Sequence, residues 1–386
     1  MNKKVCVLTA TRAEYGLLKP VILKLRSDDS YDVRVVVTGA HLSPEFGLTY
    51  REIEQDRIPI DKKIEILLSS DTPSAISKSM GLAMLGFADY FDELKPDLLL
   101  VLGDRYETLA VCCAATNQRI PIAHLYGGET TEGAVDEAFR HAITKLSFLH
   151  FTSTEQYRDR VIQLGEDPSR VFNVGALGIE NILNESLLSK EDLEKSLGFH
   201  LGDRYAVVTY HPVTLENEPS EIGFIALLNA LDEFPDLKIL FTKANADADG
   251  RIINELIDQY VLNHQNAIVV TSLGVRRYLS AAKYSSVVIG NSSSGIIEVP
   301  SLHVPTVNIG DRQKGRKMSE SIISCPPDAE SIKKAVELAV SKQFIDAVMT
   351  IVNPYEKRDT SKLICKTLEA FLYSSPISLK KSFYDR

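Results

Sequence analysis

The amino-acid sequence predicts an α/β protein of two consecutive domains, each with a parallel sheet covered by helices on both faces. Three features indicate this fold: the length of 386 residues, the alternation of short apolar runs with helical patterns, and a charged stretch without strands near the middle. A chain of this length usually forms more than one domain, each of about 100–200 residues. Strands that alternate with helices are typical of parallel sheets, because their crossover connections are helical.

The first half of the chain repeats a unit of strand, loop and helix. An apolar, β-branched run at residues 4–10 leads into a polar loop, and apolar residues then recur at helical spacing over 17–25. Further strands are predicted at residues 33–38, 96–103, 120–125 and 149–153, and helices at 108–116 and 135–146. These repeats predict a first domain over residues 1–185.

The second half begins after a charged, strandless stretch at residues 184–202, which is predicted to be a short connecting helix and linker. A second series of strands is then predicted at residues 205–210, 237–241, 267–271, 286–290 and 304–309. We therefore expect a second domain over residues 186–355. The remainder, 356–386, contains an amphipathic helix at 361–371 and a basic tail, and is expected to pack back across the domains.

Composition excludes several classes of partner. The formal net charge is -9, which argues against broad nucleic-acid binding because such binding needs a basic surface. No uninterrupted apolar stretch approaches the roughly 20 residues that a membrane span requires, and the chain start shows no secretion signal. The five cysteines include no CxxC pair and are expected to be reduced thiols. A cytoplasmic protein without nucleic-acid or membrane partners is predicted.

The loops after the strands carry the candidate functional residues of the first domain, because open parallel sheets bind ligands outside the carboxyl ends of their strands. Arg12 follows the first strand beside a helix start, where its guanidinium and backbone N–H groups could hold a phosphate. An ordinary surface arginine is the alternative. Asp104 ends the strand predicted at 96–103. It is a candidate acid or base, or the cap of the following helix.

A second loop of the first domain concentrates ionisable groups. The pair Gly127-Gly128 lets the backbone approach a ligand closely. Glu129 follows this pair and is expected to point outward from the end of the strand predicted at 120–125. Asp136, Arg140 and His141 follow on consecutive turns of one predicted helix, with Asp136 and Arg140 at i, i+4. A helical salt bridge would explain that pair equally well. Gathering these groups near one strand end would shift their pKa values.

In the second domain, His211 ends the first strand and faces the expected ligand side, although a lone histidine is usually structural. The segment from Gly290 to Gly295 places Ser292, Ser293, Ser294 and Gly295 between a strand and a helix. Free N–H groups and hydroxyls there could hold a pyrophosphate, and plain N-capping by serine is the alternative.

Three more residues of the second domain are candidates for nucleotide binding. Glu298 is expected one turn into the helix, where its carboxylate could accept hydrogen bonds from ribose hydroxyls, or could be favourable near a helix N-terminus. Arg312 and Arg316 follow the last strand and could clamp phosphates, or could be solvated charges. No metal-ligand spacing and no GxSxG serine elbow occurs. The sequence predicts no metal and no other cofactor.

Taken together, these segments resemble the hydrolysing UDP-N-acetylglucosamine 2-epimerases of bacterial sialic-acid synthesis and the epimerase half of the animal bifunctional epimerase/kinase. The resemblance covers nearly the whole chain. The motifs that carry it are TRAEY at 11–15, GDRYE at 103–107, GGE at 127–129, RHAITK at 140–145, HP at 211–212, GNSSSG at 290–295 and IGDRQKGR at 309–316. Non-hydrolysing relatives place a glutamate where this chain has Tyr126, so the resemblance favours the hydrolysing branch.

The resemblance implies a glycosyltransferase-B-like fold of two Rossmann-like domains, with the nucleotide bound mainly by the second and the sugar between them. By match to the family motifs, Asp104, Glu129 and Asp136 would be the catalytic carboxylates, and His211 would assist departure of UDP. The residues implied to hold the nucleotide are Arg12, Ser292, Ser293, Glu298 and Arg316. A homodimer or homotetramer without a cofactor is implied as well.

The resemblance therefore predicts conversion of UDP-N-acetylglucosamine (UDP-GlcNAc) and water to N-acetylmannosamine and UDP, the first step of sialic-acid biosynthesis. Elimination of UDP would give 2-acetamidoglucal, and hydration would complete the reaction. Two alternatives stay open. One is the same chemistry on another UDP-sugar, such as UDP-N,N'-diacetylbacillosamine for legionaminic acid. The other is a glycosyltransferase on the same fold.

Overall fold

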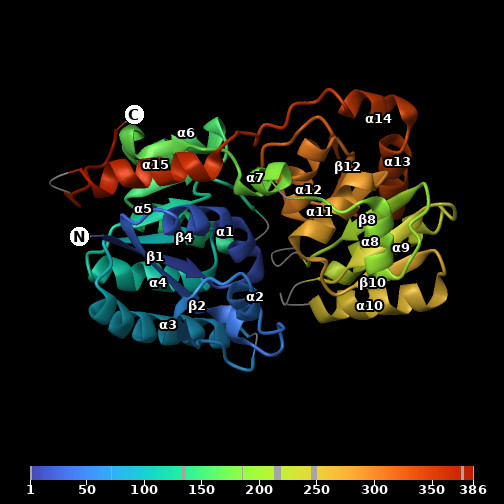
Figure 1. Cartoon of the computed structure of the whole chain (residues 1–386). Helices are drawn as coiled ribbons and strands as arrows, with labels where there is room; N and C mark the ends of the chain where they lie inside the picture. The colour runs from blue at the N-terminus through green and yellow to red at the C-terminus, as the bar shows by residue number, and fades with distance from the viewer. Residues whose placement is uncertain are drawn as a thin grey trace. The chain divides into compact units, whose positions relative to one another are not determined.

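The chain forms two compact units in the computed structural model, which describes residues 2–70, 72–132, 135–184, 186–212, 219–244, 250–374 and 378–385. The first unit comprises Met1–Glu129, Asp136–Glu180 and Lys357–Arg386, and the second comprises Thr130–Val135 and Asn181–Glu356. Figure 1 shows the chain coloured from its N-terminus to its C-terminus. The change of unit after Glu180 falls inside helix α7 (Leu177–Asn184), a few residues before the boundary expected at 185.

The first unit contains a seven-stranded parallel sheet with strand order β3-β2-β1-β4-β5-β6-β7. Its strands are β1 (Lys3–Thr9), β2 (Tyr31–Thr38), β3 (Ile60–Ile64), β4 (Leu98–Leu102), β5 (Ile122–Leu125), β6 (Leu149–Thr152) and β7 (Val171–Asn173). Its helices are α1 (Arg12–Arg26), α2 (Tyr50–Gln55), α3 (Pro73–Leu94), α4 (Tyr106–Asn117), α5 (Asp136–Leu146), α6 (Glu155–Gln163) and α15 (Thr360–Leu372), with α7 at its end.

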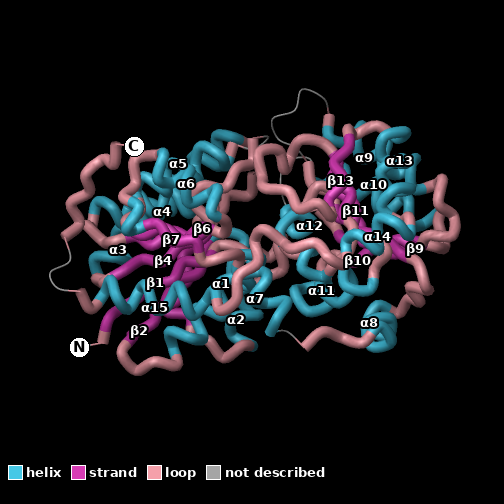
Figure 2. The backbone as a smooth tube through the Cα atoms, turned by 90° about the horizontal axis from the view of Figure 1, so that it is seen from above, coloured by secondary structure: helices cyan, strands magenta, loops and turns pink. Residues whose placement is uncertain are grey.

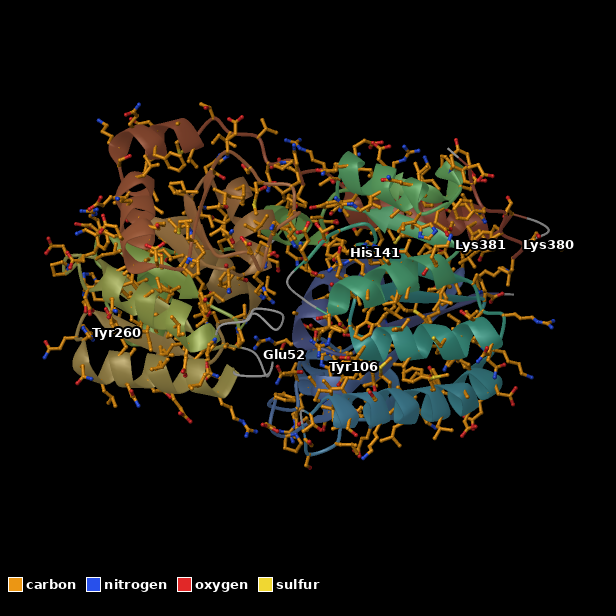
Figure 3. The ribbon with its side chains drawn as sticks, turned by 180° about the vertical axis from the view of Figure 1, so that it is seen from behind. Glu52, Tyr106, His141, Tyr260, Lys380 and Lys381 are labelled. Atoms are coloured by element: carbon orange, nitrogen blue, oxygen red, sulfur yellow. The ribbon has the colours of Figure 1, made fainter. Side chains whose placement is uncertain are left out.

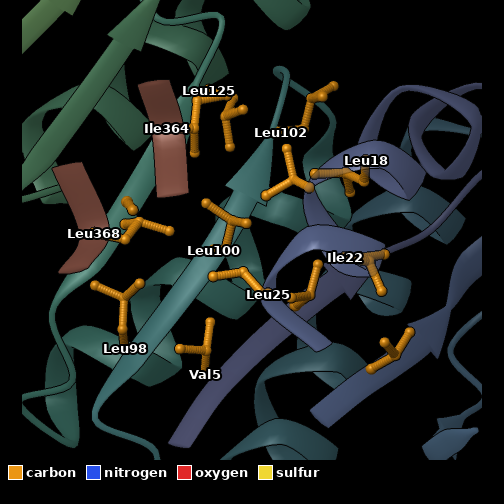
Figure 4. Close-up of a cluster of buried hydrophobic side chains, with 14 of the residues drawn as sticks. Val5, Leu18, Ile22, Leu25, Leu98, Leu100, Leu102, Leu125, Ile364 and Leu368 are labelled. Atoms are coloured by element: carbon orange, nitrogen blue, oxygen red, sulfur yellow. The ribbon is translucent and has the colours of Figure 1, made fainter. Parts of the chain in front are cut away.

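Successive residues of the central strands pack against opposite faces of this sheet, as the two-residue period of a strand requires. Val5 and Val7 belong to one buried cluster, with residues of α1 and α15, and Cys6 and Leu8 belong to another, with residues of α3 and α4. Figure 4 shows the first of these clusters, including Leu18 of α1 and the strand side chains around it. Burial on both faces explains why these strands are nearly continuous apolar runs.

The second unit contains a six-stranded parallel sheet with strand order β10-β9-β8-β11-β12-β13. Its strands are β8 (Tyr205–Thr209), β9 (Lys238–Thr242), β10 (Ala267–Val270), β11 (Val287–Gly290), β12 (Thr306–Ile309) and β13 (Ile322–Cys325). Its helices are α8 (Lys190–Leu197), α9 (Ser220–Leu231), α10 (Gly250–Asn263), α11 (Gly274–Tyr284), α12 (Ser293–Ile297), α13 (Ala329–Ala339) and α14 (Lys342–Val348). Val208 and Val207 again face different buried clusters.

Each sheet has one point at which its strand order reverses. In the first unit this switch lies between β1 and β4, and in the second it lies between β8 and β11. Figure 2 shows the strands of both units lying between helices. Ligands of open α/β sheets bind outside the carboxyl ends of the strands at such a point. The loops after β1, β4, β8 and β11 are therefore where a ligand is expected.

Three strands were missed by the sequence prediction, and all three are short or lie at a sheet edge. β3 has the sequence IDKKI, and its three central residues are exposed. β7 has only three residues, and β13 is an edge strand that is at most partly buried. Edge strands commonly carry charged residues, which prevent pairing with other chains. β3 therefore lacks the apolar run by which the central strands are recognised, whereas β7 (VFN) and β13 (IISC) carry no charge and are missed because they have only three and four residues.

The C-terminal segment belongs to the first unit. Ile364, Leu368 and Leu372 of α15 are buried in the same cluster as the inner side of α1, and Figure 4 labels Ile364 and Leu368 beside Leu100 of β4. The sequence placed this segment across both domains, whereas its residues from Lys357 onward group with the first unit. None of the helices in the described ranges combines the length and the apolar character needed to cross a membrane.

Gly290 is predicted to be essential for the second unit. Its φ is +138°, and a Cβ atom there would lie 1.9 Å from the carbonyl oxygen of Thr209. We expect Gly290→Ala to cost at least about 2 kcal/mol, because strand β8 would have to move. Gly198→Ala is the control, since Gly198 also has positive φ but faces open space. Thermal unfolding should show the larger loss for Gly290→Ala, and equal losses would contradict this steric explanation.

Candidate active site

Arg140 connects three segments at the carboxyl edge of the first sheet. It lies on the second turn of α5 and is 1% exposed. Its guanidinium donates to the carboxylates of Asp104 and Glu137 and to the backbone carbonyl of Glu129, at 2.8 Å. Asp104 follows β4 and Glu129 follows β5, so the arginine joins two neighbouring strand ends to the helix. A buried cation needs such partners, because an unpaired one would carry a large desolvation cost.

Asp104 does not cap a helix, and its side chain is partly exposed. Helix α4 begins at Tyr106 with Arg105 as its N-cap residue, so Asp104 does not cap that helix. The Asp104 side chain is 26% exposed, while one carboxylate oxygen accepts from Arg140. One side of the carboxylate is thus held by the protein and another is accessible. Of the two alternatives left open by the sequence, the structure excludes the helix cap.

Glu129 is held by the protein rather than exposed. It is 3% exposed, and its Oε1 accepts from the hydroxyl of Ser153, at 2.8 Å, at the end of β6. The neighbouring Gly128 has φ +78°, and a Cβ there would lie 2.4 Å from the carbonyl oxygen of Tyr157. The sequence suggested that these glycines let the backbone approach a ligand. The close approach at Gly128 is instead to the protein's own helix α6.

His124 is a buried residue of the site that sequence reasoning missed. It lies on β5, and burial lowers the pKa of its ring to about 3, so the ring is neutral. Its Nε2 lies 2.7 Å from the carbonyl oxygen of Gly103, and its Nδ1 lies 3.3 Å from the hydroxyl of Thr144. A carbonyl can only accept, so we assign the proton to Nε2, and the single hydroxyl proton of Thr144 is shared between Nδ1 and the carbonyl oxygen of Arg140, at 3.0 Å. The ring thereby links the end of β4 to the last turn of α5.

The first two turns of α5 carry the remaining predicted residues of this cluster. Asp136 is the first residue of the helix and is partly exposed. His141 Nε2 lies 3.2 Å from a carboxylate oxygen of Glu137. Its Nδ1 is buried and has no hydrogen-bond partner in the ranges that the structure describes. Figure 3 labels His141 on α5 and Tyr106 at the first turn of α4.

Arg12 lies at the other side of the switch point, at the end of β1. It is the first residue of α1, whose N-cap residue Thr11 accepts from the backbone N–H of Glu14 at 3.3 Å. The Arg12 side chain is partly exposed. Burial, and to a lesser extent the charge of Arg12, lower the pKa of His41 to about 4. Arg12 is therefore a cation beside a neutral histidine, which suits it to hold an anion.

Two buried carboxyl groups near this end of the sheet were also missed. Glu14 is 7% exposed and Glu107 is fully buried. Glu14 Oε2 accepts from the N–H of Ala10 at 2.7 Å, and Glu107 Oε1 accepts from Arg105 Nε at 2.6 Å. Their other oxygens, Glu14 Oε1 and Glu107 Oε2, are buried without a partner among the described residues. Burial, and then the charge of Glu107, raise the pKa of Glu14 to about 8.

In the second unit, Asn291 holds three strand ends together. Its side chain accepts from the backbone N–H of His211 and donates to the carbonyl of the same residue, both at 2.7 Å. Its own carbonyl accepts from Arg312 Nη1 at 3.0 Å and from Gln313 Nε2 at 2.8 Å. Asn291 follows β11, His211 follows β8, and Arg312 and Gln313 follow β12. His211 and Arg312, both predicted, are thus brought together by Asn291, which the sequence analysis names only as part of the 290–295 motif.

The serine-rich turn of the second unit leads into a very short helix. Ser292 is the N-cap residue of α12, and its hydroxyl accepts from the N–H of Ser294 at 3.4 Å. Ser293 begins the helix, which has five residues. Gly295 is buried against Thr306, and a Cβ there would lie 3.0 Å from its methyl group. The alternative of N-capping thus applies to Ser292. Ser293 is the first residue of the helix and does not cap it.

One prediction for the second unit is modified by the structure. Glu298 was expected in the first turn of a helix, but α12 ends at Ile297 and Glu298 is its C-cap residue. Pro300 in the following turn explains the early end, because proline cannot continue a helix. Burial raises the pKa of Glu298, and the Ser294 hydroxyl partly offsets this. Arg316 is partly buried in the loop after β12, beyond Arg312.

The described residues include no group of three or more His, Cys, Asp or Glu side chains arranged to hold a metal ion. The two sheets, their switch points and the charged loops beside them define an α/β protein of the doubly wound, nucleotide-binding class. The cations and the serine turn suit a phosphorylated ligand, and the carboxylates beside Arg140 suit proton transfer.

Comparison with known proteins identifies the family within this class. A family model described as UDP-N-acetylglucosamine 2-epimerase matches residues 23–369. The chain belongs to this family of UDP-sugar 2-epimerases, and to its hydrolysing branch as predicted. It is 45% identical over 344 residues to a Campylobacter jejuni protein named GDP/UDP-N,N'-diacetylbacillosamine 2-epimerase (hydrolyzing), with 89% of each chain covered.

Two further relatives are similar over most of their length. The polysialic acid biosynthesis protein P7 of Escherichia coli is 39% identical over 384 residues, which cover 99% of this chain and 97% of the relative. The UDP-N,N'-diacetylbacillosamine 2-epimerase (hydrolyzing) of Legionella pneumophila is 35% identical over 345 residues, which cover 89% and 91%.

Solved structures confirm the predicted fold class of two Rossmann-like, glycosyltransferase-B-like domains. The UDP-GlcNAc 2-epimerase from Neisseria meningitidis, bound to UDP-GlcNAc, has a TM-score of 0.80 at 20% identity and covers 95% of this chain and 100% of its own. The enzyme from Methanocaldococcus jannaschii, in complex with UDP-GlcNAc and UDP, has a TM-score of 0.77 at 18% identity, with 95% and 99% covered. At these identities the likeness shows the fold alone.

The raised pKa of Glu14 predicts a pH-dependent stability. The unfolded chain releases this proton near its ordinary pKa of 4.5, and the folded chain releases it near pH 8. The folded state binds the proton more tightly, so stability falls as pH rises from about 4.5 to about 8. Glu14→Gln removes this loss. Between pH 5 and pH 8, the free energy of unfolding of the variant should rise relative to that of the natural protein by on the order of 2–4 kcal/mol.

Chemical unfolding at pH 5, 6.5 and 8 would measure this difference. The exposed Glu93 on α3 provides the control, because Glu93→Gln should follow the natural protein at every pH. If Glu14→Gln and the natural protein show parallel curves, Glu14 does not hold its proton in the folded state.

Proposed function

We propose that this chain is a hydrolysing 2-epimerase that removes UDP from a UDP-linked 2-acetamido sugar and releases the free sugar with inverted configuration at C2. The observation that carries the proposal is the partly exposed Asp104 carboxylate, held by the buried Arg140 beside a switch point of the sheet. Similarity to hydrolysing 2-epimerases over almost nine-tenths of the chain supports the reaction type.

The chemistry proceeds in two steps. A carboxylate removes the proton at C2 while the C1–O bond to UDP breaks, so the electron pair of the C–H bond becomes the C1–C2 double bond. UDP departs as a diphosphate anion. Water then adds its oxygen to C1, and a proton is delivered to C2 from the opposite face. The balance is one UDP-sugar and one water consumed, and one UDP and one epimerised sugar formed. No electrons are gained or lost overall.

The residues of the first unit are assigned to the proton transfers. We assign Asp104, Glu129 and Asp136 as the carboxylates of the reaction. Asp104 is the first candidate, because Arg140 orients it and part of its side chain is accessible. Glu129 is nearly buried and would act only on a group inserted beside it.

The residues of the second unit are assigned to the departing UDP. Ser293 and the backbone N–H groups of its turn would hold the diphosphate, and His211 would donate a proton or hydrogen bond to it. Ser292, Ser294, Gly295 and Glu298 complete the proposed nucleotide site. The cations assigned to the phosphates are Arg12, Arg312 and Arg316, with Arg140 and His141 beside the sugar. Arg312 also supports Asn291, so its loss should disturb the turn as well.

The sugar that we propose first is N,N'-diacetylbacillosamine linked to UDP. Two of the relatives compared, at 45% and 35% identity, carry this sugar nucleotide in their names. The alternative is UDP-GlcNAc, with N-acetylmannosamine as the product. It is supported by the family description and by a Neisseria meningitidis relative, 28% identical over 341 residues, that is named UDP-N-acetylglucosamine 2-epimerase. A role in sialic-acid synthesis goes with the UDP-GlcNAc alternative. A cytoplasmic location and a homodimer or homotetramer are proposed for either substrate, and both rest on the family resemblance.

Proton NMR in deuterated water tests the reaction directly. The purified protein, given each sugar nucleotide alone, should release UDP and a free sugar that carries deuterium at C2. Reprotonation from solvent explains the label. We expect kcat/KM to be at least about tenfold higher for the diacetamido substrate. The reverse preference would establish the alternative sugar, and release of UDP only with an added acceptor sugar would indicate a glycosyltransferase.

Asp104→Asn should lower kcat by at least about 1000-fold, because it removes the carboxylate that is proposed first to take the C2 proton. Asparagine has the same shape and can still accept from Arg140, so the affinity for UDP should stay within about twofold. Asp89→Asn on the exposed side of α3 is the control and should turn over normally. Normal turnover by Asp104→Asn would remove Asp104 from the catalytic residues.

A further inference from the structure

The last described residues of the chain, 378–385, lie against the first unit without forming a helix or strand. We call them the C-terminal strap. The backbone N–H of Tyr384 donates to the carbonyl of Gly165 at 3.0 Å. Gly165 has φ +87°, and a Cβ atom there would lie 2.3 Å from the ring of Phe383. The ring of Phe383 thus packs directly over Gly165, whose positive φ favours glycine.

Lys381 of the strap uses all three of its N–H donors. Its Nζ lies 2.7 Å from Oε2 of Glu166, 3.0 Å from the carbonyl oxygen of Lys145 and 2.6 Å from the carbonyl oxygen of Ser147. An ammonium group has three donors, so its hydrogen-bonding capacity is filled. Lys145 and Ser147 lie at the C-terminal end of α5, where carbonyls lack helical partners and a cation is favoured.

Glu166 forms an ion pair with Lys381. It is fully buried and also accepts from His150 Nε2 at 3.0 Å and from Lys145 Nζ at 2.6 Å. Burial alone would raise the pKa of Glu166, but the hydrogen bonds from His150, Lys145 and Lys381 lower it to about 2. The carboxylate is therefore charged at every physiological pH, and it joins β6, the end of α5 and the strap.

Helix α5 is held at two places along its length. Its last turn is held by Lys381 and by the contact of Thr144 with His124, and its second turn is held by the pairing of Arg140 with Asp104. The helix has eleven residues, or roughly 16 Å. Backbone hydrogen bonds join each turn of the helix to the next. A shift at its C-terminal end is therefore transmitted to the turns that carry Asp136 and Arg140.

We propose that the C-terminal strap is a positioning element of the active site, in which Lys381 anchors α5 so that its first turns hold Arg140 against Asp104. Lys381 touches no reacting atom and acts through the helix. The kinetic consequence of this inference rests on the proposed function, because Asp104 is assigned there as a catalytic carboxylate. The structural consequence, a firmly held α5, does not.

Lys381→Met is the test variant, because methionine keeps most of the aliphatic chain and removes the three donors. The neighbouring Lys380 is exposed, and Figure 3 labels both lysines. Lys380→Met is therefore a matched control. We expect kcat of Lys381→Met to fall about tenfold with KM within about twofold, since small misplacements of catalytic groups lower kcat strongly. Lys381→Arg keeps the charge, so its kcat should lie between those of Lys381→Met and the natural protein. The kcat of Lys380→Met should equal that of the natural protein.

Amide hydrogen exchange of the same variants gives a readout that does not depend on activity. Lys381→Met, and a chain ending at Ser374, should exchange faster along α5, including Arg140 and His141 on its second turn, whose N–H groups bond within the helix. Faster exchange only at the last turn, or none, would overturn the proposal, as would kcat values equal to those of Lys380→Met. If the natural protein releases no UDP from any sugar nucleotide, the proposed function fails, and exchange in the first turns of α5 still decides the role of the strap.

Discussion

The candidate active site depends on one buried cation, the guanidinium of Arg140. A cation that is 1% exposed is stable only if its donors are used and its charge is balanced. Asp104 and Glu137 supply the balancing charge, and the carbonyl of Glu129 takes a further donor. The arginine therefore specifies where the ends of β4 and β5 lie relative to α5, and it gives Asp104 one orientation.

The two units solve the same positioning problem with different chemistry. The first unit uses a charged side chain, Arg140, to join its strand ends. The second uses the neutral residue Asn291, whose side-chain amide pairs with both backbone groups of His211 and whose backbone carbonyl accepts from Arg312. A charged hub suits a region that must hold carboxylates close together, because they would otherwise repel one another. A neutral hub leaves nearby cations available for an anion, as the proposed diphosphate site requires.

Most of the fold could be predicted because the central strands are buried on both faces and appear as apolar runs, such as LLLVL in β4. The edge strand β3 could not, because its exposed face carries charges. Asp104 and Arg140 were found from their places after a strand and on a helix, but their pairing is a tertiary contact that no periodicity reports. Glu14 and Lys381 were missed for a related reason. Charged residues in a loop or tail are normally solvated, and only the fold shows that these are partly or wholly buried.

The coupling between Arg140 and Asp104 tests the central claim most directly. Melting temperatures of Arg140→Met, Asp104→Asn and the double variant form a double-mutant cycle. If the buried guanidinium depends on that carboxylate, Asp104→Asn will cost at least about 1 kcal/mol less in the Arg140→Met background than in the natural protein, because the carboxylate has already lost its partner. Equal costs in both backgrounds would show that the two residues act independently, and would contradict the account.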